Sequence, residues 1–161
     1  MRAAGVAATL SLVMASAAVV CAQGLSAERT LHEMAARDDV PGLARAINGG
    51  VPVDVRNQAG ETALHVAARE AHLFSAMMLI AKGANTNARD AKQRIPLHLA
   101  ADGDARQAGE RYQIVKLLVA KGSDRNALDA DGKRPVDYAK TVEFRRALAP
   151  PVTSRKASPR R

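Results

Sequence analysis

Aromatic residues are nearly absent from this sequence of 161 residues, which has no Trp and only two Phe and two Tyr. Catalytic pockets and the stacking surfaces of single-strand nucleic-acid binders usually depend on aromatic side chains. Their scarcity argues against both classes of protein. The core of a single domain must instead come from Leu, Ile, Val, Met and many Ala residues, and such small side chains suit closely packed helices.

Cysteine is also scarce, because the single Cys is Cys21, in an N-terminal segment that differs from the rest of the chain. A short basic start leads into an apolar run over residues 3–20, and "VCAQG" follows. This layout predicts a secretory signal peptide over residues 1–22, cleaved after Ala22. The mature chain would then contain no cysteine, which is compatible with an oxidising periplasm. We therefore expect a periplasmic or secreted protein.

Two alternatives to a cleaved signal peptide remain open. The apolar run is nearly long enough to span a membrane, so it could remain as an uncleaved anchor. Lipidation of Cys21 is disfavoured, because Val20 is a poor residue to precede a lipidated cysteine. A twin-arginine pair is missing from the start of the chain, which favours export of the unfolded protein by the general route.

Acidic residues are outnumbered, with 16 Asp and Glu against 24 Lys and Arg, for a net charge of +8. Four basic residues lie in the last segment, residues 150–161 ("PPVTSRKASPRR"), which predicts a basic disordered tail. A solvated tail is favoured. The alternative is an exported effector or surface-binding protein whose tail contacts anionic lipid or nucleic acid. The rest of the chain is only mildly basic, which disfavours a dedicated nucleic-acid surface.

Leu-His pairs recur every 33 residues, at Leu31-His32, Leu64-His65 and Leu97-His98. Other columns repeat in the same register: Gly50, Gly83 and Gly122; Asp54, Asn87 and Asn126; and Asn57, Asp90 and Asp129. The last interval of these columns is 39, so six residues are inserted within residues 102–113. "DGKRPVDYA" (131–139) then restarts the pattern, with Asp137 in the histidine position. A period near 33 indicates a repeat architecture.

The two central repeats, "GETALHVAAREAHLFSAMMLIAKGANTNARD" (60–90) and "IPLHLAAD…IVKLLVAKGSDRNALD" (95–129), resemble the ankyrin repeat. The resemblance extends over residues 26–149. It implies an all-α solenoid of three to four stacked helix-turn-helix units with extended turn loops, at about 26–57, 58–90, 91–129 and 130–149. The first unit lacks its opening turn and the fourth is short, as terminal repeats often are.

Periodicity within one unit predicts the same architecture. "TALHVAAREA" and "LFSAMMLIAKG" each carry apolar residues at helical spacing, and Lys82 and Gly83 are typical of a helix end. One hairpin cannot cover its own apolar face, so neighbouring units must cover each other. We expect the core to contain Leu64, Leu79, Leu97 and Leu118.

The repeated histidines could serve a metal, catalysis or packing. Equivalent positions in successive units stand about 10 Å apart, too far for shared zinc ligands. Thr62 and Ser75 lie in no recognisable nucleophile motif, so a small hydrolase is disfavoured. The resemblance implies a structural role in which Thr62 caps the first helix and His65 joins its hydroxyl to the neighbouring loop. Ile95 leaves the cap of the third unit in doubt. The residues assigned to the framework are His32, Thr62, His65, Gly83, Pro96, His98 and Gly122.

Positions that the framework does not explain are the turn tips and the exposed residues of the first helices. The resemblance implies that such positions bind a partner protein, without identifying it. The insertion could lengthen the helices or form a contact loop, and its Tyr112 could anchor a partner or pack inside. We expect no cofactor, metal, small-molecule substrate or membrane contact after signal cleavage. The candidate partner-binding residues are Gln58, Ala59, Glu61, Arg69, Glu70, Ala91, Lys92, Gln93, Arg94, Asp102, Tyr112, Asp131, Lys133 and Arg134.

Overall fold

The computed structural model describes residues 31–103 and 108–149, and all regular structure in these two ranges is helical. A helical segment at residues 31–36 comes first. The helices that follow are α2 (Val40–Asn48), α3 (Ala63–Glu70), α4 (Leu73–Ala81), α5 (Pro96–Ala101), α6 (Ala108–Ala120), α7 (Pro135–Tyr138) and α8 (Val142–Leu148). The prediction of an all-α stack of helical hairpins is confirmed.

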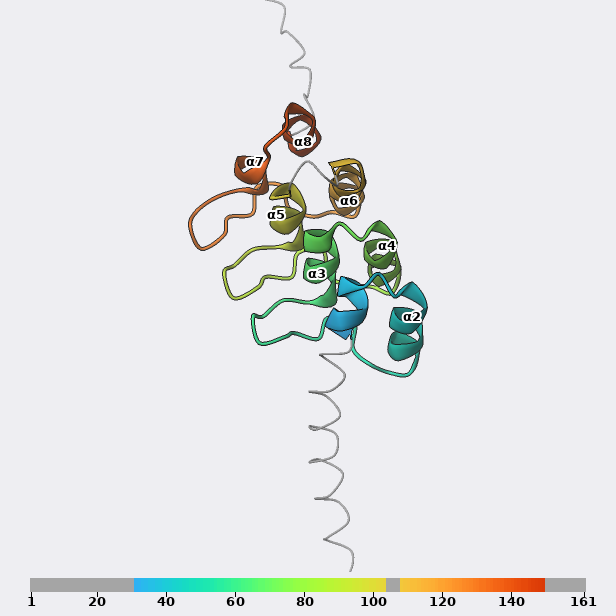
Figure 1. Cartoon of the computed structure of the whole chain (residues 1–161). Helices are drawn as coiled ribbons and strands as arrows, with labels where there is room; N and C mark the ends of the chain where they lie inside the picture. Colours follow the sequence, from blue (N-terminus) through green and yellow to red (C-terminus); the bar gives the residue numbers. More distant parts are fainter. Residues whose placement is uncertain (1–30, 104–107, 150–161) are drawn as a thin grey trace, which may run out of the picture.

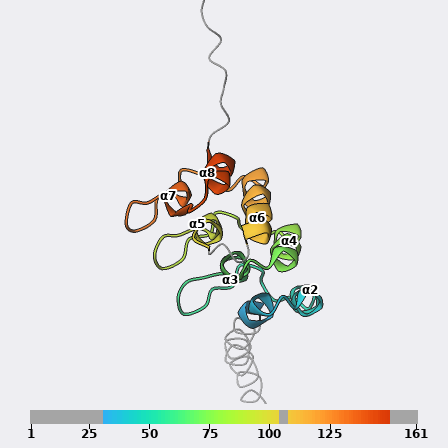
Figure 2. The same cartoon turned by 45° about the horizontal axis from the view of Figure 1, so that its top comes forward.

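The hairpins stack with their first helices in one layer and their second helices in another (Figure 1). In the inner layer α3 packs on α5 and α5 packs on α7. In the outer layer α2, α4, α6 and α8 pack on one another in that order. The loops between hairpins, here called the fingers (residues 49–61, 82–94 and 121–133), project side by side from the inner layer, away from α4 (Figures 1 and 2).

Leucines that the repeat pattern assigned to the core are fully buried. Leu64, Leu79, Leu97 and Leu118 each have no exposed surface, and they belong to one continuous cluster that runs along the stack. Alanines of the inner helices, including Ala67 and Ala100, are also fully buried. Small side chains at these positions let α3 and α5 approach closely, so each hairpin covers the apolar face of the next.

The predicted glycine stops are confirmed at the ends of the outer helices. Gly50, Gly83 and Gly122 have φ angles of 97°, 89° and 84°. A left-handed conformation at this position ends a helix and is strained for residues with a Cβ atom. The chain therefore turns at the same point in each unit and enters the next finger with the same direction.

The insertion of the third unit lengthens an outer helix. α6 has 13 residues where its counterpart α4 has nine. Residues 104–107, the predicted signal peptide (1–22) and the predicted tail (150–161) lie outside the described residues. Among the helices of the described ranges, none combines the length and apolar character needed to cross a membrane.

Candidate functional site

Each finger is a tight turn closed by one side chain. Asp90 Oδ1 accepts hydrogen bonds from the backbone N–H groups of Lys92 and Arg94, both at 2.8 Å. Asn57 and Asp129 make the equivalent bonds in the other two fingers, all at 2.9 Å. Because these side chains satisfy the buried side of the turn, the finger has a fixed shape before any partner arrives.

The three turns share a left-handed residue just before their last position. Gly60 and Gly132 occupy this position in the first and third fingers, each with a φ angle of 72°. The middle finger has Gln93 there, at a φ angle of 60°. A residue with a Cβ atom is strained in this region, which marks Gln93 as an exception to the repeat.

Neighbouring fingers are joined by their backbones. The N–H of Ala91 donates to the carbonyl of Ala59 at 3.1 Å, and the N–H of Ala130 donates to the carbonyl of Lys92 at 2.9 Å. Arginine side chains add a second link. Arg56 donates to the carbonyls of Gly60 and Arg89. Arg89 repeats this one unit later, donating to Gln93 and Leu128. The fingers therefore form one continuous row.

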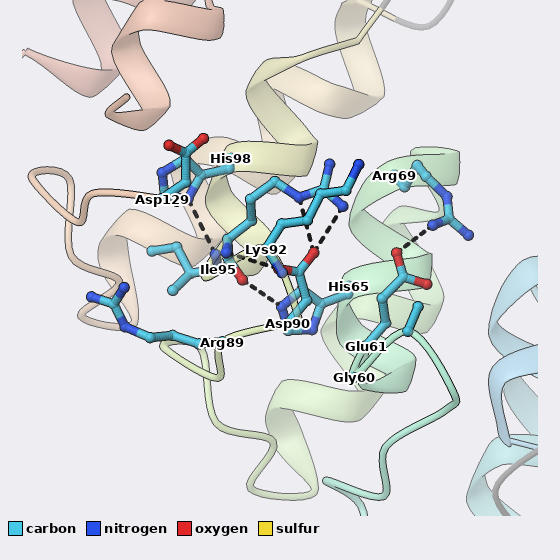
Figure 3. A network of polar contacts seen from close by, with 12 residues as sticks. Gly60, Glu61, His65, Arg69, Arg89, Asp90, Lys92, Ile95, His98 and Asp129 are labelled. Carbon is cyan, nitrogen blue, oxygen red and sulfur yellow. Dashed lines mark hydrogen bonds and ion pairs between the residues drawn. The ribbon is translucent and has the colours of Figure 1, made fainter. Parts of the chain in front are cut away.

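The repeated histidines link each unit to the next, as predicted. Their Nε2 atoms lie within hydrogen-bond distance of a backbone carbonyl in the following finger: 2.7 Å from His32 to Glu61, 3.0 Å from His65 to Arg94 and 3.1 Å from His98 to Lys133. Figure 3 shows His65 and His98 one unit apart, with Asp90 beside His65. No group of three His, Cys, Asp or Glu side chains among the described residues is placed to hold a metal ion.

Hydrogen bonding assigns the proton of these imidazoles. The backbone N–H of Thr62 donates to Nδ1 of His65 at 3.1 Å, so Nδ1 is unprotonated and Nε2 carries the hydrogen that Arg94 accepts. The N–H of Ile95 donates to Nδ1 of His98 in the same way, at 3.1 Å. Burial lowers the pKa of both imidazoles below the ordinary 6.5. Both histidines are therefore neutral links at pH 7.

An imidazole caps both α3 and α5, and the expected bridge through the Thr62 hydroxyl is present at α3. This hydroxyl lies 2.9 Å from Nδ1 of His65 and donates to it, while Nε2 of His65 reaches the Arg94 carbonyl of the next finger. The acceptor of the first backbone N–H is the imidazole, which needs no hydroxyl partner. This explains how Ile95 can begin α5 while His98 keeps its role.

The residues that link units forward change at the end of the stack. Asp137 occupies the histidine position in the last unit, where its carboxylate accepts the N–H of Arg134 at 2.9 Å. An ionised carboxylate can cap α7 but has no proton to donate to a further unit. In the third unit, Leu128 occupies the position of Arg56 and Arg89 and has no side-chain N–H to donate. At these two positions the third and fourth units therefore lack the side chains that bond earlier units to the next one.

Most of the candidate partner-binding residues lie on the surface. The exposed ones are Gln58, Ala59, Arg69, Glu70, Ala91, Lys92, Gln93, Asp102, Asp131, Lys133 and Arg134. The fingers bring seven of these candidates together. They are Gln58 and Ala59 in the first finger, Ala91, Lys92 and Gln93 in the second, and Asp131 and Lys133 in the third. Asp102 lies at the C-terminal end of α5, 3.9 Å from Lys140. Arg134 pairs with Asp137 at 3.3 Å.

Three candidates are bonded or packed within the fold, and the exposure expected for Glu61 is wrong. Glu61 is buried, and its carboxylate accepts from Arg69 (Figure 3) and from Asn57. Arg94 is half-buried and bound to the Asp90 carboxylate, with 2.8 Å between its Nη2 and Oδ2 of Asp90. Tyr112 is half-buried, with its ring edge-on to Phe144 at 6.1 Å between centroids. Glu61 and Arg94 hold the finger bases, and Tyr112 packs between outer helices.

Sequence reasoning missed Arg111, which fastens the inserted segment to the inner layer. Its guanidinium donates to the carbonyl of Arg69 at 2.6 Å and to that of Leu99 at 3.4 Å. Both carbonyls belong to the last turns of inner helices, where the helix dipole favours a cation. The side chain also lies against Gly103, where an added Cβ would clash with it. The position of Arg111 within the insertion could have drawn attention to it. The carbonyls that it binds, however, are 42 and 12 residues away in sequence.

Neither nucleophile candidate is exposed. Ser75 is fully buried, and its hydroxyl donates to Oδ1 of Asp38 at 2.6 Å. Thr62 is also fully buried and bound to His65. Both hydroxyls thus serve contacts between helices or units.

Comparison with known proteins names the architecture. A model of ankyrin repeats, in three copies, matches residues 31–129, which is more than half of the chain. The chain belongs to the ankyrin-repeat family. Ankyrin repeats are generally non-catalytic modules for protein–protein interaction. The matched range contains the first three hairpins of this ankyrin-repeat protein, and α7 and α8 follow it.

Two curated relatives match part of the chain. The chain is 40% identical over 52 residues to the NF-kappa-B inhibitor cactus of Drosophila yakuba, which covers 32% of this chain and 11% of that protein. The cactus protein of Drosophila melanogaster matches equally, over 10% of its length. The match thus spans about a tenth of the length of these relatives.

Proposed function

We propose that this ankyrin-repeat protein is a non-catalytic module, exported to the periplasm, that binds a partner protein through its finger tips and the adjoining inner helices. The family supports binding of a protein in general. The relatives named as inhibitors of NF-kappa-B are consistent with a role in which binding controls another protein. The partner of this chain is unidentified.

The observation that carries the proposal is that some finger side chains hold the fold together while others make no contact within it. Asn57, Asp90 and Asp129 close the turns, and the arginines and histidines link the units. By contrast, the side chains of Gln58, Lys92 and Gln93 make no hydrogen bond or ion pair among the described residues, and all three are exposed. A rigid row of backbone thus presents side chains that the fold itself does not use.

Rigidity is the physical advantage of this arrangement. A loop that is ordered only on binding loses conformational entropy at that moment, which weakens the complex. Here the turn bonds and the links from Ala91 to Ala59 and from Ala130 to Lys92 already hold the fingers. The strained φ angle of Gln93 fits this interpretation, because strain retained at an exposed tip is common at binding sites.

Affinity capture from an envelope extract tests the proposal. The finger variant Gln58→Ala/Lys92→Ala/Lys133→Ala removes three exposed side chains that close no turn. The matched outer-layer variant Gln113→Ala/Lys116→Ala/Lys121→Ala makes the same three changes at exposed sites on and just after α6. Arg69 and Arg94 are left intact, because their loss would release Glu61 and Asp90 and disturb the fold.

The proposal predicts that a partner retained by the natural chain and by the outer-layer variant is lost with the finger variant. Equal retention by all three proteins would contradict it. Circular dichroism of both variants confirms that they remain folded.

Export has a separate test. Cleavage after Ala22 predicts that the protein isolated from the envelope begins at Gln23, which N-terminal sequencing or intact mass measurement detects. Recovery of a chain that retains residues 1–22 would contradict this part of the proposal and would favour an anchor.

A further inference from the structure

Helix α4 differs from the other outer helices in having no charged residue. Its sequence, LFSAMMLIA, is apolar around the whole helix apart from the buried Ser75. Phe74, Met77, Met78 and Ala81 occur at the spacing of a single helical face. Phe74 is 65% exposed and Met77 is 49% exposed. A helix that is apolar on its solvent side usually has a partner there. We call these four residues the outer patch.

The helices on either side of the outer patch contribute positive charge. α2 and α6 both pack on α4. Arg45 in α2, Lys82 after α4, and Lys116 and Lys121 in and after α6 are all exposed. The three helices together contain one carboxylate, Glu110. Of the carboxylates just before α2 and α4, Asp38 is bonded to Ser75, Asp39 caps α2 and Glu70 pairs with Arg69. Protruding Phe and Met side chains bordered by lysine and arginine are typical of surfaces that rest on anionic lipid.

The predicted N-terminal signal or anchor would bring the domain close to a membrane. Its apolar run of residues 3–20 ends eleven positions before Leu31, the first residue that the structure describes. Eleven positions reach at most about 40 Å when fully extended. A signal or an anchor at residues 3–20 would therefore place the domain beside a bilayer during export.

We propose that the outer patch and its flanking cations dock this protein on an anionic lipid surface, with Phe74 and Met77 at the level of the headgroups. The fingers project from the opposite side of the stack (Figures 1 and 2) and so remain free for a protein partner. Docking by this face is independent of the proposed finger function and of the basic tail.

The chain contains no Trp, so a single introduced Trp reports on one site in the full-length protein. Phe74→Trp places the fluorophore in the outer patch. Leu128→Trp is the matched control, because Leu128 is an apolar residue on the finger side and is 51% exposed. An anchor at residues 3–20 would bring both positions to the vesicle without inserting either one.

The experiment mixes each protein with vesicles of phosphatidylcholine and phosphatidylglycerol, and with vesicles that also contain brominated lipid. Docking predicts that the emission of the position-74 fluorophore shifts to shorter wavelength and is quenched by bromine, while that of position 128 changes little. Equal changes at both positions, or none at position 74, would overturn the proposal. A shift at position 74 that grows with protein concentration without vesicles would assign the patch to a second copy and would also overturn it.

Charge variants test the lipid class. Lys116→Gln/Lys121→Gln, introduced into the Phe74→Trp protein, should weaken the vesicle binding measured by its fluorescence by roughly 25-fold. Each basic residue at an anionic surface contributes about a factor of five. The matched finger variant Lys92→Gln/Lys133→Gln should leave it unchanged. Equal binding to vesicles of phosphatidylcholine alone would contradict the role of charge.

Discussion

At the scale of single residues, the hydrogen bonds of two imidazoles explain why histidine recurs. A neutral imidazole accepts at one nitrogen and donates at the other. His65 and His98 use both, accepting a backbone N–H at the start of their own helix and donating to a carbonyl of the next finger. Neither an ionised carboxylate nor a lysine can do both, and Asp137, in the histidine position of the fourth unit, only accepts hydrogen bonds from Arg134.

These imidazoles predict a pH dependence of stability. Burial lowers the pKa of His65 and His98 in the folded protein, so the unfolded chain binds protons first as the pH falls below 6.5. The free energy of unfolding should therefore decrease as the pH falls from 7.5 to 5.5. Urea denaturation across this range measures it. Replacing both residues by Gln should lower stability and flatten the dependence, and an unchanged slope in that variant would contradict the assignment.

Substitution of Gln93 by glycine should raise the free energy of unfolding, whereas the histidine substitutions should lower it. Its left-handed φ angle costs about 1 kcal/mol that glycine avoids, so Gln93→Gly should raise the free energy of unfolding by up to about that amount. Gln58→Gly is the control. Gln58 is absent from the residues with positive φ, so the same change there should destabilise by about 0.5–1 kcal/mol. Chemical denaturation that ranks the two variants in the reverse order would contradict the strain.

At the scale of helices, burial of the inner layer supplies the stability. Leu97→Ala should cost about 2–5 kcal/mol, because Leu97 is fully buried between neighbouring hairpins. Leu128→Ala, at an exposed finger position, should change stability by about 0.5 kcal/mol or less. Thermal or urea denaturation compares the two. Equal stability of Leu97→Ala and the natural protein would contradict the packing described.

Arg111 gives a second prediction at this scale. Arg111→Lys keeps the charge but loses the fork that reaches both Arg69 and Leu99, so it should destabilise the protein by about 1–2 kcal/mol. Amide hydrogen exchange should show loss of protection at the C-terminal ends of α3 and α5. A loss confined to α6 would show that the arginine serves only its own helix.

Helices and their ends were predictable because their signals are local. The periodicity of residues 62–83 placed α3 and α4, and Gly83 and Gly122 marked the stops. The exposure of Glu61 was wrongly predicted, because its partners Arg69 and Asn57 come together only when the finger folds back. Arg56, Arg89 and Arg111 were missed for the same reason. Each bonds a carbonyl that lies 33 or more residues away in sequence, and no local pattern marks such a contact.

At the scale of the molecule, the stack has two different sides. The fingers present polar tips on a rigid row, and the outer layer presents an apolar helix between cations. Each unit is bonded to the following one by the side chains of His32, His65, His98, Arg56 and Arg89. Asp137 and Leu128 occupy the equivalent positions later in the chain and have no side-chain N–H to donate. The four hairpins thus behave as one unit of structure, in which each repeat is stabilised by the next.

The central claim is that the fingers, and not the outer layer, bind the partner protein. Photo-crosslinking in intact cells measures this directly, with a photoreactive residue introduced at position 58 or 93 in the fingers or at position 113 in α6. The account predicts one and the same protein adduct from positions 58 and 93 and none of that mass from position 113. That adduct arising from position 113 alone, or no protein adduct from either finger position, would contradict it.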